Sequence, residues 1–324
     1  MHRRQVLAAM AAGWTAGSSA IAQGNYPSRP IKLICPLAAG GGADIAARAV
    51  GDYIAQKLRQ PVFVDNRVGA GTQIGTEAAV KSPADGYTLF LLPGDIAAID
   101  KAFNASVPYD VQKDLVFVSG VASIPLVLVG STALQARTLD DVVKKAQAAP
   151  QSMTFGSLGS SSPHYLFFEW FKHRAGIRLN DVPYKSTSQA TTDLIGARID
   201  LTMLGEVNAA NQAKSGRLVP IAATAERRSR LLPDVSTFSE SYPGLVMNNW
   251  YALAAPVGTP KSVIELVHQA TQEALGQEAV MTRMAAIGLS PWTRTPTELA
   301  EVFQHHVTHY GEIIRDSGAK HEGR

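Results

Sequence analysis

The sequence predicts an α/β fold with mainly parallel sheets, and three features of the chain lead to this class. Short runs rich in β-branched residues alternate with longer amphipathic segments, as in successive βα units. Hydrophobic residues make up 46% of the 324 residues and charged residues 18%, a balance typical of a folded globular protein. The length is sufficient for two compact domains, and no fixed-period repeat interrupts the pattern.

The start of the chain has the composition of an export signal. A basic segment, His2-Arg3-Arg4, precedes an Ala-rich apolar run from Val6 to about Ala16. Ala20-Ile21-Ala22 then gives a small-x-small cleavage site, so we predict a signal peptide over residues 1–22. The apolar run is too short to span a bilayer comfortably. The arginine pair leaves both the Sec and the twin-arginine export routes open.

Charge and cysteine content exclude several other classes of protein. Without Arg3 and Arg4 the chain has 28 basic against 27 acidic residues, a net charge of +1 instead of +3. No basic stripe is present, so we expect no nucleic-acid partner. The single cysteine, Cys35, excludes an internal disulfide. His305 and His309 have i,i+4 spacing without an accompanying acidic motif, so we expect no metal site and no cofactor.

The first series of βα units starts with a strand at Ile31–Cys35 and a helix at Ala43–Leu58. Ile45, Ala49 and Leu58 lie on one face of this helix. Three further elements are expected: a strand at 61–65, a short helix at 76–81 and a strand at 87–91. Strands are also expected at 117–121 and 126–129. They flank Ser123-Ile124-Pro125, which we interpret as the crossing into a second lobe.

A second series of units follows this crossing. It comprises helix 138–149, strand 153–157, helix 164–175, strand 181–184, helix 189–195 and strands 199–204 and 220–224. A strand at 249–255 is expected to return to the first lobe, followed by helices at 261–275 and 296–316. We therefore predict lobe 1 from residues 23–125 plus 250–324 and lobe 2 from residues 126–249. The aromatic residues of 165–171 have the helical spacing typical of core packing.

A glycine-rich loop, Pro36–Asp44, joins the first strand to the first helix. In open α/β sheets, ligands bind outside the carboxyl ends of the strands. The three glycines Gly40–Gly42 let the backbone approach a ligand, and the amides at the helix start favour an anion. Asp44 is expected to cap the helix. A dinucleotide site is the alternative, with Asp65 as the ribose-binding acid, but Ile45 occupies the position where a third small residue is needed.

A hydroxyl-rich loop, Gly156–His164, joins a strand of the second series to its helix. Its four serines and two glycines suit the binding of a carboxylate by hydroxyls and amides. One serine is expected to act only as the helix N-cap. The alternative is a serine hydrolase that uses Ser160 or Ser161, although the loop lacks the Gly-x-Ser-x-Gly pattern of a nucleophile elbow.

Several short motifs, taken in their order along the chain, resemble one family. The chain resembles the solute receptors of the tripartite tricarboxylate transporters, often called Bug receptors, over essentially its whole mature length. The motifs that carry the resemblance are Tyr26–Leu33, Gly40–Asp44, Asp65–Gly71, Pro83–Leu89, Val182–Lys185, Leu232–Val235 and Ala255–Pro260. The sequence departs from the family pattern at four places: Ser186, Leu204-Gly205, Pro93–Ile96 and the aromatic stretch Tyr165–Phe171, which is bulkier than is typical.

The resemblance implies a periplasmic, two-lobed binding protein of the Venus-flytrap type without catalytic activity. Such receptors hold a small carboxylate or related organic solute with backbone amides, hydroxyls and waters, and deliver it to membrane permease subunits. We expect a monomer. The site expected from the resemblance and the two loops comprises Leu37, Ala39, Gly40, Gly41, Gly42, Asp44, Ser157, Ser160, Ser161, His164, Tyr184 and Leu204. The departures leave the identity of the solute open.

Overall fold

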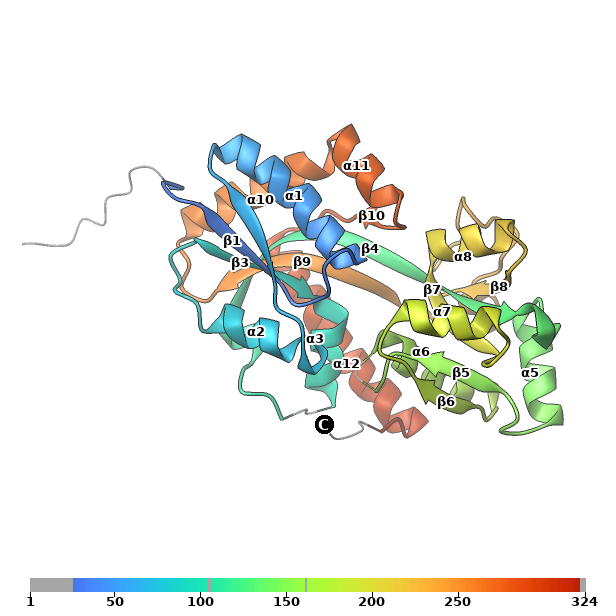
Figure 1. Ribbon diagram of the computed structural model, residues 1–324. Coiled ribbons are helices and arrows are strands. Elements are labelled where there is room, and N and C mark those ends of the chain that lie inside the picture. The colour runs from blue at the N-terminus through green and yellow to red at the C-terminus, as the bar shows by residue number, and fades with distance from the viewer. Residues whose placement is uncertain (1–25, 104–105, 161, 321–324) are drawn as a thin grey trace, which may run out of the picture.

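The computed structural model describes residues 26–103, 106–160 and 162–320. Within these ranges the chain forms one ten-stranded sheet with helices on both of its faces (Figure 1). The sheet passes through two halves of the molecule, which have a two-lobed α/β architecture. The predicted signal peptide lies outside the described residues. Among the helices that are described, none has both the length and the hydropathy needed to cross a bilayer.

The first half contains the start and the end of the described chain. Its initial elements are β1 (Ile31–Cys35), α1 (Gly42–Leu58), β2 (Val62–Asn66), η1 (Ala70–Thr72), α2 (Gln73–Val80), β3 (Thr88–Pro93), α3 (Gly94–Ala102) and α4 (Val111–Asp114). Its final elements are β9 (Asn248–Pro256), α10 (Lys261–Leu275), α11 (Glu278–Ala285), β10 (Ser290–Pro291) and α12 (Pro296–Ser317).

The second half is formed by the middle of the chain. It is entered through the long strand β4 (Leu115–Ser131). Its other elements are η2 (Thr132–Leu134), α5 (Leu139–Ala148), β5 (Thr154–Ser157), α6 (Pro163–Ala175), β6 (Asn180–Pro183), α7 (Thr187–Ile195), β7 (Leu201–Gly205), α8 (Glu206–Lys214), β8 (Leu218–Ala223) and α9 (Phe238–Ser241).

The sheet combines parallel outer strands with antiparallel central ones. Its order is β2-β1-β3-β9-β4-β7-β5-β6, and β8 and β10 also pair with β4. In the first half β1 is parallel to β2 and β3, and in the second half β5 is parallel to β6 and β7. Every pairing of β4 or β9 is antiparallel. The expected parallel pattern therefore describes the outer strands only, because β4 and β9 pass between the halves.

The crossing strand β4 is continuous, whereas the sequence indicated two strands separated by 123–125. Its first part pairs with β9 as far as the partners Pro125 and Asn248. From Leu126 onward it pairs with β7 and β8 instead. Pro125 lies where the partner strands change, a position that tolerates the missing N–H of proline.

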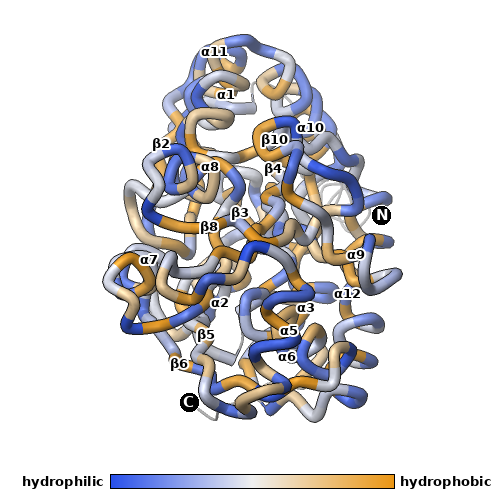
Figure 2. The backbone as a smooth tube through the Cα atoms, turned by 90° about the vertical axis from the view of Figure 1, so that its right-hand side faces the viewer, coloured by the Kyte–Doolittle hydropathy of each residue, from blue (hydrophilic) through white to orange (hydrophobic). Residues whose placement is uncertain are grey.

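The helices cover the two faces of the sheet in separate groups (Figure 1). In the first half α1, α10 and α11 lie on one face, and α2, α3 and α12 on the other. In the second half α7 and α8 lie on one face, and α5 and α6 on the other. Figure 2 shows α1 and α11 at one end of the molecule and α6 and β6 at the opposite end. Helices α3, α8 and α11 were not predicted from the sequence.

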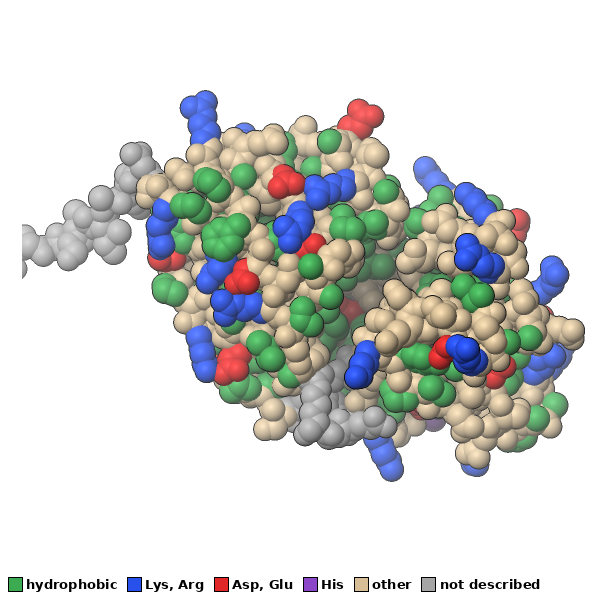
Figure 3. Space-filling view, in the orientation of Figure 1, with side chains coloured by type: hydrophobic (Ala, Val, Ile, Leu, Met, Phe, Trp, Pro, Cys, Tyr) green, Lys and Arg blue, Asp and Glu red, His purple; other side chains and the backbone are tan. Residues whose placement is uncertain are grey.

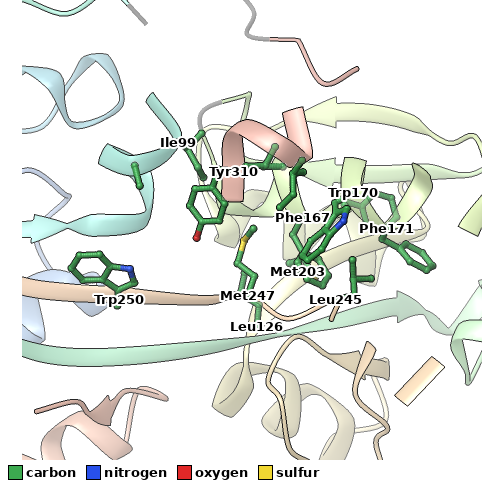
Figure 4. Close-up of a cluster of buried hydrophobic side chains, with 14 of the residues drawn as sticks. Ile99, Leu126, Phe167, Trp170, Phe171, Met203, Leu245, Met247, Trp250 and Tyr310 are labelled. Atoms are coloured by element: carbon green, nitrogen blue, oxygen red, sulfur yellow. The ribbon is translucent and has the colours of Figure 1, made fainter. Parts of the chain in front are cut away.

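The largest hydrophobic cluster extends through both halves (Figure 4). Helix α12 contacts α3 in the first half and α6 in the second half. The aromatic residues of α6 join this cluster, and Phe167, Phe168 and Phe171 are all almost completely buried. The prediction that this aromatic run packs in the core is confirmed.

Candidate functional site

The molecular surface is hollowed between the two halves, as Figure 3 shows. The loops that follow β1 and β5 both lie at this hollow, and α1 and α6 begin beside it (Figure 1). The arrangement follows from the topology. Strand β1 runs in the direction of β4, toward the second half, whereas β5 runs against β4, back toward the first half, so the carboxyl ends of β1 and β5 face each other. Ligands of open α/β sheets bind outside such ends. The structure therefore brings the two predicted loops to one place from opposite halves.

The loop after β1 is held by the buried carboxylate of Asp44. The backbone N–H of Gly40 donates to Asp44 Oδ2 at 2.9 Å, and Asn66 Nδ2 donates to Oδ1 at 3.0 Å. Arg48 forms an ion pair with the same carboxylate at 2.9 Å. Burial raises the pKa of Asp44, but the bonds from Arg48, Gly40 and Asn66 outweigh it and hold the pKa below its ordinary value.

The expected capping role of Asp44 was wrong. Gly41 is the N-cap of α1, and Asp44 lies within the first turn. Its carboxylate reaches back to the Gly40 amide, so it fixes the loop instead of capping the helix. Both carboxylate oxygens of Asp44 accept hydrogen bonds from the loop and its neighbours, so Asp44 stabilises the conformation of the loop.

The same loop presents backbone donors that have no protein acceptor. Within the described residues, the amides of Leu37, Ala39 and Gly42 donate no hydrogen bond to the protein. Residues 38–41 are exposed, and Gly40 has a φ of 77°, a left-handed conformation that favours glycine. The unpaired amides at the start of α1, together with the helix dipole, make this end of the helix suitable for an anion.

In the loop after β5 two serines organise the backbone. The hydroxyl of Ser157 donates to Asp181 Oδ2 at 2.9 Å and accepts from the Gly159 amide at 3.2 Å. Ser162 is the N-cap of α6, because its hydroxyl accepts from the Tyr165 amide. The prediction that one serine only caps the helix is confirmed for Ser162. Ser160 lies half-exposed on the loop, and Ser161 lies outside the described residues.

His164 lies in the first turn of α6 with its side chain almost completely buried. Burial lowers the pKa of this imidazole to about 4, so it is neutral near pH 7. Its Nδ1 is buried without a partner among the described residues. The backbone amides of Leu158 and His164 donate no hydrogen bond within the described chain, so this loop also offers free donors.

The remaining two predicted residues lie at the carboxyl ends of β6 and β7, the strands on either side of β5. Tyr184 follows β6, and its hydroxyl donates to Asp193 Oδ2 at 2.9 Å. Its ring packs against Gly156, where a Cβ would lie 3.2 Å from a ring carbon. Leu204 lies in β7 and is buried, with 1% of its surface exposed. Both residues are therefore near the loop after β5, but their described contacts are with the protein interior.

Two other junctions, each at the carboxyl end of a strand that neighbours β1 or β5, were not predicted as parts of the site. One is the passage from β3 into α3, where burial raises the pKa of Asp95 to about 7 against the effect of three backbone N–H groups. The other is the passage from β7 into α8 at Gly205 and Glu206. A strand followed at once by a helix, with a small residue at the junction, is the signal that identifies both.

The geometry of the serine loop does not favour a catalytic relay. Ser157 bonds directly to Asp181, and the imidazole of His164 has no carboxylate partner among the described residues. A Ser-His-Asp mechanism needs a base that is hydrogen-bonded to the nucleophile and oriented by an acid.

A separate cavity of about 350 Å³ lies between α12 and β9. It is lined in part by His306 and Trp292 and shares no residue with either loop.

Comparisons with known proteins identify relatives over most of the chain. The family model described as tripartite tricarboxylate transporter family receptor matches residues 46–319. Protein BugT of Bordetella pertussis is 36% identical over 309 residues, which cover 94% of this chain and 95% of that protein. The periplasmic binding protein BugD is similar in structure, with a TM-score of 0.79, 25% identity, and coverage of 92% of this chain and 100% of BugD. R. palustris Rpa4515, solved with adipate, has a TM-score of 0.83 at 25% identity and covers 92% of this chain and 100% of its own.

Proposed function

Because the chain belongs to the family of tripartite tricarboxylate transporter receptors, we propose that it is a periplasmic receptor that captures a small carboxylate for a membrane permease. The observation that carries this proposal is the position of two loops with unpaired amides, on opposite halves, at one hollow. The family and the fold are those of solute-binding proteins. The presence of adipate in the structure of a relative supports a carboxylate as the ligand class.

Backbone dipoles are proposed to neutralise the carboxylate. Neither Pro36–Asp44 nor Gly156–His164 contains Lys or Arg. The amides of Leu37, Ala39 and Gly42 would bind one carboxylate oxygen or a bridging water. The amides of Leu158 and His164 would bind the solute from the opposite half. Asp44 and Ser157 would act by holding the two loops in this conformation.

We further propose that binding draws the halves together as lobes. Lobe 1 would comprise residues 23–125 plus 250–324, and lobe 2 residues 126–249. The change of partners along β4 at Pro125 and Leu126 supports a hinge at this point. A solute shifts the equilibrium toward the closed form only if it binds that form more tightly. We also propose that residues 1–22 are removed on export and that the receptor acts as a monomer.

The experiment is a thermal-shift and calorimetric screen of the mature chain with mono-, di- and tricarboxylates and the corresponding amides. A solute present at a hundred times its dissociation constant stabilises the folded protein by about 2.7 kcal/mol. Mass spectrometry of solute that co-purifies with the protein gives independent identification. If no organic acid or amide changes the melting temperature, the proposed carboxylate function is wrong.

A single backbone donor can be removed to test the site directly. Gly42 is the first residue of α1, and Gly41 before it is extended with φ −78° and ψ 171°. Proline is favoured at this helix position and accepts such a preceding residue, so Gly42→Pro removes one N–H while the helix persists. We expect an affinity about 10- to 100-fold weaker, as for the loss of a hydrogen bond to a charged group.

The matched control is Glu278→Pro. Glu278 is the exposed first residue of α11, and Gln277 before it is also extended. This variant should bind the solute as the wild type does. Equal affinities for the Gly42→Pro and Glu278→Pro proteins would exclude the α1 amides from the site.

A further inference from the structure

Glu206 lies at the same edge of the sheet as the serine loop. It is the first residue of α8 and directly follows Gly205, the last residue of β7. Strand β7 is parallel to β5, with Phe155 opposite Leu201 and Gly156 opposite Thr202. The junction of β7 with α8 is therefore beside the loop that follows β5.

Contacts on either side of Glu206 place it between the two halves. On one side Gly205 pairs with Leu126 of the crossing strand. On the other side Val207 touches the turn before β10, since a Cβ on Gly288 would lie 3.1 Å from Val207 Cβ. Leu289, the next residue of this turn, contacts the start of α1, because a Cβ on Gly42 would lie 3.9 Å from Leu289 Cδ2. The start of α8 is thus linked by direct contacts to the predicted anion site of the first half.

The carboxyl group of Glu206 has no compensating partner in the part of the chain that the structure describes. About half-buried, it forms no hydrogen bond or ion pair with the described residues, and burial raises its pKa. Three other buried or partly buried acids have a basic partner: Asp44 pairs with Arg48, Asp110 with Lys101, and Asp193 with Arg198. Partial removal of an acid from water without a partner is unfavourable. The carboxyl group of Glu206 is therefore free to accept from water or from a donor on a bound solute.

We propose that Glu206 selects the end of the solute that is remote from its bound carboxylate, so that the solute is a carboxylate that also carries an ammonium or other N–H donor. This inference rests on the proposed receptor function. The amides at the start of α1 attract the carboxylate at one end of the solute. The carboxylate of Glu206 repels a second carboxylate at the other end of the solute but accepts a hydrogen bond from an N–H donor there. A symmetric dicarboxylate of the same length would place like charges together at Glu206.

The test is a calorimetric titration of the mature, ligand-free chain with four series of unbranched probes matched in chain length. The series are monocarboxylates, α,ω-dicarboxylates, ω-amino acids and α-amino acids, each of about three to seven carbons. We expect a probe from one amino series to bind at least about tenfold more tightly than the dicarboxylate of equal length, as for one charge-assisted hydrogen bond. In Glu206→Gln, which keeps the size of the side chain, this preference should fall about tenfold or more.

Glu278→Gln is the matched control, because Glu278 is also the first residue of a helix but is exposed. It should keep the wild-type order of affinities. If carboxylates bind but the wild type prefers dicarboxylates, or if Glu206→Gln leaves the preference unchanged, the role of Glu206 is refuted and the receptor function stands. If no probe of any series binds, the proposed carboxylate function fails, and the inference fails with it.

Discussion

At the scale of single residues, two buried polar side chains hold the loops of the candidate site. Asp44 accepts from Gly40 and Asn66 and pairs with Arg48, and these bonds fix the loop that carries the unpaired amides. Ser157 acts in the same way in the other half, through Asp181 and Gly159. Buried, fully bonded polar side chains fix a loop more rigidly than exposed ones, and a rigid loop loses less entropy when it binds.

The buried histidine of the second loop predicts a dependence of stability on pH. The pKa of His164 is about 4 in the folded protein, against an ordinary value of 6.5. Between these values the unfolded chain binds more protons, so the free energy of unfolding decreases as the pH falls from 6.5 to 4 and then levels off. A shift of this size corresponds to about 3 kcal/mol. His306, whose pKa is also lowered to about 4, contributes in the same direction.

Replacement of His164 by Asn should therefore reduce the loss of stability between pH 7 and pH 4 without abolishing it. Urea denaturation at several pH values measures this difference. His173→Asn, at an exposed position later in the same helix, is the control and should follow the wild-type profile. A His164→Asn protein that lost as much stability in acid as the wild type would contradict the burial of a neutral imidazole.

At the scale of elements, the passage of β3 into α3 shows how closely the first half is packed. Helix α3 begins at Gly94, immediately after the last residue of β3, and no side chain caps it. The six-membered ring of Trp250 lies against Gly94, so a Cβ there would come within 2.0 Å of a ring carbon. Trp250 is itself buried, with 2% of its surface exposed, so it cannot move aside.

Gly94→Ala should therefore be strongly destabilising, by about 3 kcal/mol or more, because the interior cannot accommodate the added methyl group. Gly311→Ala is the matched control within α12, where the nearest atom, Arg315 Nη1, is 3.6 Å from the built Cβ. Alanine is favoured over glycine inside a helix, so this variant should be more stable by about 0.5–1 kcal/mol. Urea unfolding measures the free energy of unfolding of both variants. A Gly94→Ala protein as stable as the wild type would contradict the contact with Trp250.

The same junctions explain which parts of the fold and site were predictable from the sequence. The strands β1 and β5 and the loops after them carry local signals: hydrophobic runs, then glycines or serines, then amphipathic helices. Helices α3 and α8 start with no intervening turn, after Pro93 and Gly205, so they lack a sequence boundary. The position of Glu206 depends on strand register and on the contact of its neighbour Val207 with Gly288, which is distant in sequence and leaves no local pattern.

At the scale of the whole molecule, α12 connects the halves on the face away from α1. Phe303 of this helix lies 5.7 Å from Phe117 of β4, measured between ring centroids. Farther along the helix, His309 lies 5.0 Å from Trp170 of α6. Closely packed interfaces do not deform continuously. We therefore expect the proposed closure of the lobes to keep these contacts of α12 and to proceed by movement about the crossing strands.

The shared cluster also predicts that the two halves unfold together. Since α12 completes the core of both, neither half can lose it and stay folded, so calorimetry should give one transition with equal calorimetric and van't Hoff enthalpies. Phe303→Ala should lower the free energy of unfolding by about 3–5 kcal/mol and keep a single transition, because Phe303 is buried in the cluster that both halves share. Phe63→Ala, on the half-exposed ring of β2, is the control and should cost far less. Two resolved transitions, in the wild type or in Phe303→Ala, would contradict a common core and would make the halves separate folding units.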